Sequence, residues 1–141
     1  MRNYKKLPIC TIAIAAANVL IFLGLSFMGM TEDSAFMMEH GAMYVPYLMN
    51  GERYYTLITS MFLHFGFSHL MNNMVMLLVI GYSLEPETGK IRFLLIYLGS
   101  GLMGNLVSAW FDVNQGSYAV SAGASGAIFG IVGALLYVAI R

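Results

Sequence analysis

Residues 124–140 read ASGAIFGIVGALLYVAI, an apolar run of 17 residues without a charged side chain. Similar runs cover residues 7–30, 68–84 and 91–111. Each has about 17–24 residues, the length that crosses a hydrocarbon core of roughly 30 Å as a helix. A helix is required because backbone polar groups in lipid must be satisfied within the segment. The sequence therefore predicts an all-α, polytopic membrane bundle with four transmembrane helices in a single domain, residues 1–141.

The composition excludes several other classes of protein. Hydrophobic residues make up 59% of the chain and charged residues 10%, against roughly 45–50% and about 25% in soluble domains. A soluble domain of this size could not bury so much apolar surface, and a disordered chain would carry more charge. The net charge is zero and no polybasic patch predicts nucleic-acid binding. The single cysteine, Cys10, excludes a disulfide framework.

The basic residues predict the orientation in the membrane. With a cytoplasmic N-terminus, Arg53 alone lies outside, and the connection 31–67 becomes an outer segment lying partly in the membrane interface. The six basic residues then inside are Arg2, Lys5, Lys6, Lys90, Arg92 and Arg141. A cleaved signal peptide is a weaker interpretation, since apolar sequence continues past residue 17. We expect an integral, multi-pass protein of the bacterial plasma membrane.

Polar residues in membrane spans are costly and point to function. His69 and Asn73 are four residues apart and share one helical face. Ser125 begins the last apolar run, and the predicted topology places all three in the outer leaflet. A serine nucleophile with imidazole, amide and helix-start N–H donors suits acyl transfer. Gly123 and Gly126 would allow a substrate to approach closely.

Structural interpretations of the same residues remain open. Ser125 could be a helix N-cap, and His69 and Asn73 could be interhelical hydrogen-bonding residues. A metal site is not favoured, because the spacing of its candidate ligands matches no known pattern. Those ligands would be Glu39, His40, His64 and His69. Small residues recur at every fourth position, which predicts a face for a specific partner helix or generic packing against residues 68–84. They are Ala122, Gly126, Gly130 and Ala134, with Gly133 beside them.

Two motifs resemble the rhomboid family of intramembrane serine proteases. Residues 59–74 read TSMFLHFGFSHLMNNM, with HxxxN at His69–Asn73, and residues 121–130 read SAGASGAIFG, with GxSG at 123–126. The resemblance implies cleavage of transmembrane segments of other proteins near the outer leaflet, without a cofactor or metal. It implies that Ser125 is the nucleophile and that its own N–H, Asn73 and His69 form the oxyanion hole. It gives supporting roles to Gly123 and Gly126, to Phe129 against the catalytic histidine, to His64 in the outer loop and to Glu85, within GxxxE, as a structural glutamate.

The chain departs from the family pattern in two places. The family core has six helices with the general base, a histidine, on the sixth, whereas the fifth and sixth helices are absent from these 141 residues. Loss of the base lowers kcat by about 10⁴–10⁶, so we expect the chain alone to be nearly inactive without the missing helices or a second chain. The family's aromatic-Arg pair reads Tyr55-Thr56 here, with Arg53 nearby.

Three other hypotheses follow from the same residues. His69 could act as a substitute base, and its replacement by alanine would then abolish activity. A non-catalytic rhomboid-like protein could bind transmembrane clients through the same groove. A small transporter or channel subunit is less favoured, because the sequence contains no inverted repeat.

Overall fold

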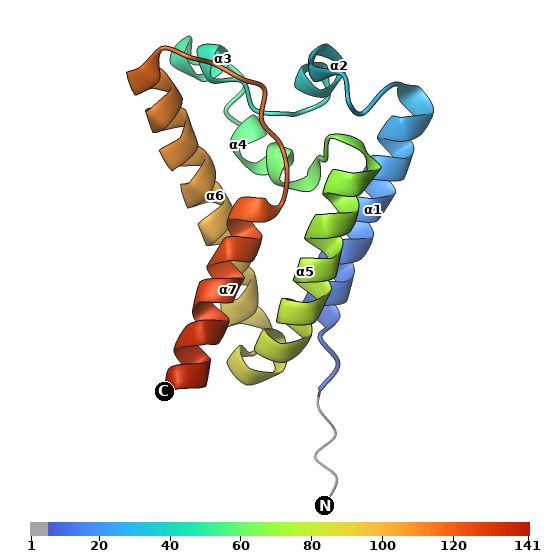
Figure 1. The fold of residues 1–141 in the computed structure, drawn as a ribbon, viewed down its shortest axis with the longest axis vertical. Helices are drawn as coiled ribbons and strands as arrows, with labels where there is room; N and C mark the ends of the chain where they lie inside the picture. Colours follow the sequence, from blue (N-terminus) through green and yellow to red (C-terminus); the bar gives the residue numbers. More distant parts are fainter. Residues whose placement is uncertain (1–5) are drawn as a thin grey trace, which may run out of the picture.

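The computed structural model describes residues 6–141, and they form a bundle of apolar helices beneath a cap of short ones (Figure 1). The long helices are α1 (Ile9–Met28), α5 (Gly66–Thr88), α6 (Lys90–Gln115) and α7 (Ser125–Ile140). They confirm the predicted all-α membrane bundle. Three are long and apolar enough to span a membrane, while α7 has 16 residues, or about 24 Å at 1.5 Å per residue.

The ends of the helices differ from the predicted runs by a few residues. The third helix continues to Gln115, beyond the predicted end at residue 111, although Asp112 and Asn114 are polar. It ends where Gly116 takes up the left-handed conformation at φ 65° and its N–H bonds to the Asp112 carbonyl. Hydropathy marks where a helix is apolar, whereas the backbone conformation at a glycine marks where it ends.

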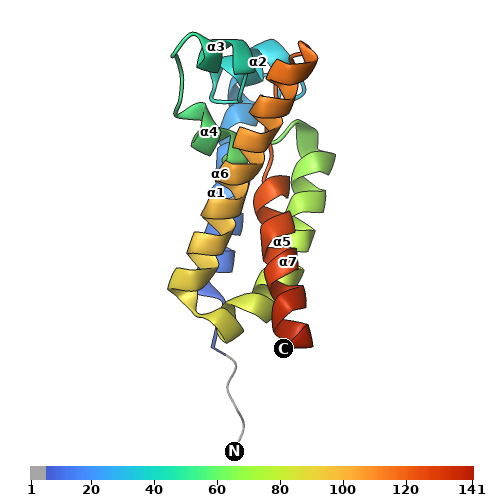
Figure 2. The same ribbon diagram turned by 90° about the vertical axis from the view of Figure 1, so that its left-hand side faces the viewer.

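Helices α5 and α7 lie side by side, with α1 against the far side of α5 and α6 against α7 (Figures 1 and 2). The segment after α6 descends from the top of the bundle before α7 begins, so α7 starts deeper than the level at which α5 starts and α6 ends. A single core joins the four long helices and includes Phe22, Leu77, Tyr97 and Ile131. Apolar side chains such as Leu95, which is 68% exposed, face outward, as lipid contact requires.

Gly126 and Gly130 of α7 pack against α6, so α6 is the partner helix for this part of the small-residue face. A Cβ placed on Gly126 would lie 3.9 Å from the Cα atoms of both Gly101 and Gly104. One placed on Gly130 would collide with the Ser100 side chain. The alternative of packing against the second span was wrong for Gly126 and Gly130. Gly101 and Gly104 on α6 let the backbones of α6 and α7 approach closely. The sequence analysis did not consider these two glycines.

The predicted outer segment forms a folded cap of short helices. Its short helices are α2 (Ser34–Glu39), α3 (Val45–Met49), α4 (Thr56–Thr59) and the 3-10 helix η1 (Ser60–Phe62). Met37, Ala42 and Leu63 form a small buried core within it. Arg53 Nη1 donates to the Met38 carbonyl at 3.2 Å and its guanidinium lies 4.2 Å from the centre of the Tyr47 ring. Arg53 thus ties two parts of the cap together.

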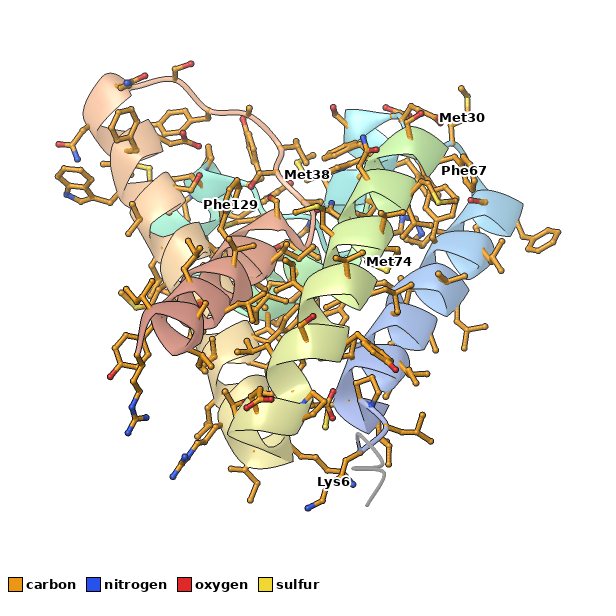
Figure 3. The ribbon with its side chains drawn as sticks, turned by 60° about the horizontal axis from the view of Figure 1, so that its bottom comes forward. Lys6, Met30, Met38, Phe67, Met74 and Phe129 are labelled. Carbon is orange, nitrogen blue, oxygen red and sulfur yellow. The ribbon has the colours of Figure 1, made fainter. Side chains whose placement is uncertain are left out.

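The basic residues used for the predicted orientation are distributed as expected along the bundle. Lys6 lies at the end of the bundle away from the cap (Figure 3), where α5 meets α6 at Lys90 and where α7 ends. Arg53 lies in the cap. Arg2 and Lys5 lie outside the described residues. The orientation itself, with the N-terminus in the cytoplasm, stays a prediction.

Candidate active site

The segment that precedes α7 is held at both of its ends. Met43 and Ser121 exchange two backbone hydrogen bonds of 2.9 Å, which attach the segment to the cap. The Gly123 N–H then donates to the Ser60 carbonyl at 2.8 Å. The Ala124 N–H donates to Nε2 of His64 at 3.4 Å. The residues directly before Ser125 are therefore fixed by η1 and by the histidine that follows it.

Gly123 is the point at which the two polar residues of α5 converge. Its φ is 130°, in a region that L side chains rarely adopt. A Cβ at this position would lie 2.8 Å from Cε1 and 2.9 Å from Nε2 of His69, and 3.7 Å from Nδ2 of Asn73. The structure thus brings His69 and Asn73, as the HxxxN spacing predicts, to a point two residues before Ser125. Only glycine leaves room for the imidazole there.

Backbone donors fix the tautomers of the two histidines at the site. The Phe65 N–H donates to Nδ1 of His69 at 3.3 Å, so the neutral ring carries its proton on Nε2, the atom beside Gly123. His64 accepts through Nε2, so its proton is on Nδ1, which is buried without a partner. The two rings meet edge to face with centroids 5.1 Å apart. Burial, with a smaller effect from His69, lowers the pKa of His64 to about 4, and His64 is therefore neutral at pH 7.

Asn73 carries an amide donor that nothing in the described residues satisfies. Its side chain is 8% exposed, and Nδ2 is buried without a hydrogen-bond partner. Such a group costs about 1–3 kcal/mol when left unpaired, and its persistence calls for an explanation. Together with the Nε2–H of His69, it gives two N–H donors directed at one place. This arrangement can stabilise a negatively charged oxygen.

Ser125 is the first residue of α7 and is exposed. The N-cap position is Ala124, so the N-cap interpretation of Ser125 does not hold. A cavity of about 190 Å³ lies beside it, between α6 and the segment before α7. The cavity is lined by Gly101, Gly104, Asn105, Ser108, Ser121, Ala122, Gly123, Ser125 and Gly126. The hydroxyl that is the candidate nucleophile thus has space in front of it.

Asn105 on α6 is a site residue that the sequence reasoning missed. Its Nδ2 donates to the Leu57 carbonyl at 2.7 Å and to Ser60 Oγ at 3.0 Å. Since the Ser60 carbonyl holds the Gly123 N–H, Asn105 supports the backbone that positions the glycine. An amide inside an apolar span was the available signal, because polar groups in membrane helices are rarely without a role.

The remaining predicted site residues lie apart from this cluster. Phe129 on α7 is 76% exposed (Figure 3). Glu85 lies at the other end of α5, where its carboxylate accepts from the Cys10 N–H at 2.9 Å, the Thr11 N–H at 2.7 Å and Thr11 Oγ1 at 2.8 Å. His40 lies at the end of α2 and donates from Nδ1 to the Phe36 carbonyl at 2.7 Å. Within residues 6–141 no three His, Cys, Asp or Glu side chains are grouped to hold a metal ion.

Comparison with known proteins identifies the family. The Rhomboid domain matches residues 51–141, which is more than half of the chain and includes both motifs. The chain belongs to the rhomboid family. It is an integral, multi-pass membrane protein related to proteases of that family.

Three relatives illustrate the similarity. Rhomboid protease GluP of Bacillus subtilis (strain 168) is 39% identical over 133 residues, which cover 94% of this chain and 25% of the relative. RHOMBOID-like protein 5 of Arabidopsis thaliana is 52% identical over 86 residues, which cover 61% of this chain and 27% of the relative. Putative rhomboid protease YdcA of Bacillus subtilis (strain 168) is 44% identical over 88 residues, which cover 62% of this chain and 42% of the relative. The matched part of the chain thus spans from a quarter to about two fifths of the length of these relatives.

Proposed function

We propose that these residues form the nucleophile and oxyanion hole of an intramembrane serine endopeptidase. The observation that carries the proposal is the convergence of His69 Nε2 and Asn73 Nδ2 on Gly123, two residues before an exposed Ser125. Both donors are available, since the tautomer of His69 gives Nε2 a proton and Nδ2 of Asn73 has no partner. No metal or cofactor enters this chemistry.

The proposed chemistry assigns one step to each group. Ser125 Oγ attacks the scissile carbonyl and forms a tetrahedral oxyanion. The oxyanion accepts hydrogen bonds from His69 Nε2–H, Asn73 Nδ2–H and the Ser125 N–H, which is free because it lies in the first turn of α7. Donors of this kind each contribute on the order of 10²–10³ in kcat. Collapse of the intermediate then expels the amine and leaves an acyl-enzyme at Ser125.

The general base for Ser125 is the group that this site does not supply. His69 presents an N–H, not a lone pair, toward Gly123, since its Nδ1 accepts from Phe65. His64 uses its Nε2 lone pair on Ala124, and His40 stacks on Phe36 in the cap. We therefore propose that a histidine outside residues 1–141 takes the proton from Ser125 and returns it to the leaving amine, and that these residues alone are nearly inactive. The hypothesis of His69 as a substitute base is disfavoured by its tautomer.

The substrates and their side of attack follow from the same arrangement. The site lies at the cap end of α5, and the predicted orientation places the cap outside the cytoplasm of a bacterial cell. A transmembrane segment of another protein reaching Ser125 would then be cut in its outer half. The substrate is thus another membrane protein, and the lipid bilayer is the medium in which the two meet.

Labelling by a fluorophosphonate probe tests the proposal. In vesicles, the probe should phosphonylate Ser125 slowly, and added imidazole should accelerate labelling because it supplies the absent base. Ser125→Ala should abolish the signal. Ser108→Ala is the matched control, because Ser108 lines the same cavity and should leave labelling unchanged. Labelling at the rate of a complete serine protease without imidazole would show that a base is present within these residues.

A client-binding protein without catalytic activity is the second candidate, and the lack of an imidazole lone pair at Ser125 favours it. The labelling experiment separates the two. A non-catalytic relative would show no imidazole-dependent labelling at Ser125, although it would still retain transmembrane clients.

A further inference from the structure

A second polar region lies at the end of the bundle away from Ser125, where α5 meets α6 and α1 begins. It contains a cavity of about 560 Å³. Three cationic side chains line it, Lys6, Lys90 and Arg92, against a single carboxylate, Glu85. The other lining residues are Leu7, Pro86, Thr88, Gly89 and Ile91. The excess of positive charge makes this cavity suited to an anion.

The one carboxylate does not cancel that charge locally. Both oxygens of Glu85 are occupied by donors at the start of α1, namely the Cys10 N–H, the Thr11 N–H and Thr11 Oγ1. None of the three cations makes an ion pair or a side-chain hydrogen bond with another of residues 6–141. All three are exposed. The first turn of α6 adds N–H groups, since its N-cap, Gly89, has no capping side chain.

An apolar groove continues from this cavity along the outside of the bundle. It has a volume of about 590 Å³ and is formed by the start of α1 and the second half of α5. Leu7 lines both the groove and the charged cavity. Val79 and Tyr82 line the groove, and Pro86 lines the cavity. Pro86 follows Val79 by seven residues and Tyr82 by four, so all three lie on the same face of α5. The two spaces therefore adjoin at Leu7.

Two of the three hydroxyls in the groove are already used within the protein. Thr11 Oγ1 donates to Glu85, and Ser83 Oγ donates to the Val79 carbonyl at 3.3 Å. The rest of the lining is apolar apart from the Tyr82 hydroxyl: Leu7, Pro8, Ile12, Leu78 and Val79. The groove thus favours a hydrocarbon chain, whereas the cavity at its end favours an anion.

We propose that the cavity and the groove together bind one anionic phospholipid. Its phosphodiester lies among Lys6, Lys90 and Arg92, and one acyl chain lies along the groove between α1 and α5. Basic pockets between transmembrane helices bind anionic head groups in this way. The proposal depends on the chain being in a membrane and not on its proposed catalytic activity, so either can fail alone.

A tryptophan reporter and brominated lipids test the proposal. Trp110 is the only tryptophan, so Trp110→Phe with Tyr82→Trp leaves one reporter in the groove. Phosphatidylcholine vesicles would contain a fixed minor fraction of brominated phosphatidylglycerol or, for comparison, of brominated phosphatidylcholine. We expect the anionic lipid to quench this reporter with an apparent affinity about tenfold higher than that of the zwitterionic lipid. The natural Trp110, on the other half of α6, should show no preference.

Charge-removal variants identify the residues responsible. Arg92→Gln should lower the preference about fivefold, since a cation near the membrane surface contributes about 1 kcal/mol to binding an anionic lipid. Arg141→Gln removes one charge at the same end of the bundle but outside the cavity, and should leave the preference unchanged. Equal quenching by the two lipids, or equal effects of the two variants, would overturn the proposal. Soluble glycerophosphate should not relieve quenching; full relief would overturn it too, because the acyl chain would then contribute nothing.

Discussion

The two ends of α5 carry buried polar side chains that differ in how well they are satisfied. At the end away from the cap, the Glu85 carboxylate accepts three hydrogen bonds from α1, between 2.7 and 2.9 Å long. At the cap end, Asn73 Nδ2 and His64 Nδ1 are buried without a partner. Satisfied groups hold a fold together, whereas unsatisfied donors are retained at a cost to stability. We interpret the end with Glu85 as structural and propose a chemical role for the cap end.

The other unsatisfied atoms within residues 6–141 do not weaken this contrast. They are Asn18 Oδ1 on α1 and Tyr97 Oη on α6, an acceptor and a hydroxyl that belong to neither end of α5. Near Ser125, in contrast, both unsatisfied atoms are N–H donors. Neither donor has an acceptor within the described residues, and we propose that a substrate oxygen accepts from Asn73.

Removing the Glu85 carboxylate, at the end of α5 away from the cap, should have the largest effect on stability. Glu85→Ala leaves the Cys10 and Thr11 N–H groups buried without an acceptor, and we expect a loss of about 3 kcal/mol in the free energy of unfolding. Unfolding in detergent measures it. Glu87→Ala, two residues further on and exposed, is the control and should change stability by less than about 0.5 kcal/mol. Equal losses of stability in the two variants would show that Glu85 does not have the structural role assigned to it.

Adding one methyl group at Gly123 should come next. Gly123→Ala combines a φ of 130° with a contact of 2.8 Å to the His69 ring, and we expect a loss of about 1–3 kcal/mol. Gly99→Ala is the matched control, because nothing lies within 4 Å of a Cβ there and a helical position gains about 0.5–1 kcal/mol from alanine. Both are measured by thermal unfolding. Two variants of similar stability would show that Gly123 is not in close contact with His69.

Replacing the unsatisfied amide should have little effect on stability. Asn73→Leu keeps the shape of the side chain and removes a buried donor that has no partner, so we expect a change of less than about 0.5 kcal/mol or a slight gain. The same unfolding measurement applies. A loss comparable to that of Glu85→Ala would mean that Asn73 has a structural partner and that the contrast between the two ends is wrong.

The pH dependence of stability should show a smaller effect from His64 near neutrality. Its folded-state pKa, lowered by burial to about 4, is below the ordinary value of 6.5. The unfolded state therefore binds more protons between these values, and stability is full above about pH 6.5 and decreases as the pH falls toward 4. Unfolding measured across this range should show a shallower decrease for His64→Gln. Parallel profiles would show that His64 is not buried in its neutral form.

Much of the bundle follows from local sequence features. Apolar runs predicted the four long helices. The spacing of His69 and Asn73 predicted a common helical face, and the predicted topology placed both in the same leaflet as Ser125. The predicted packing of the small residues on α7 against residues 68–84 was wrong for Gly126 and Gly130, which contact α6. Periodicity shows that a helix face permits close approach but not which helix approaches. The cap depends on contacts between distant residues, such as Arg53 with Met38, which no local pattern encodes.

Other features of the site depend on the folded backbone. The sequence shows a glycine at position 123 but not its φ of 130°, which depends on bonds to Ser60 and His64 from another part of the chain. The tautomer of His69 depends on the Phe65 N–H in the same way. These bonds determine which groups can donate and which can accept a proton.

We propose that the unsatisfied donors at the cap end stabilise an oxyanion formed at Ser125. The rate of phosphonylation of Ser125 by a fluorophosphonate, measured with imidazole present, tests it most directly in Asn73→Leu against the unaltered chain. We predict a decrease of about 10²-fold at nearly unchanged stability. An unchanged rate in a stably folded Asn73→Leu protein would contradict the claim.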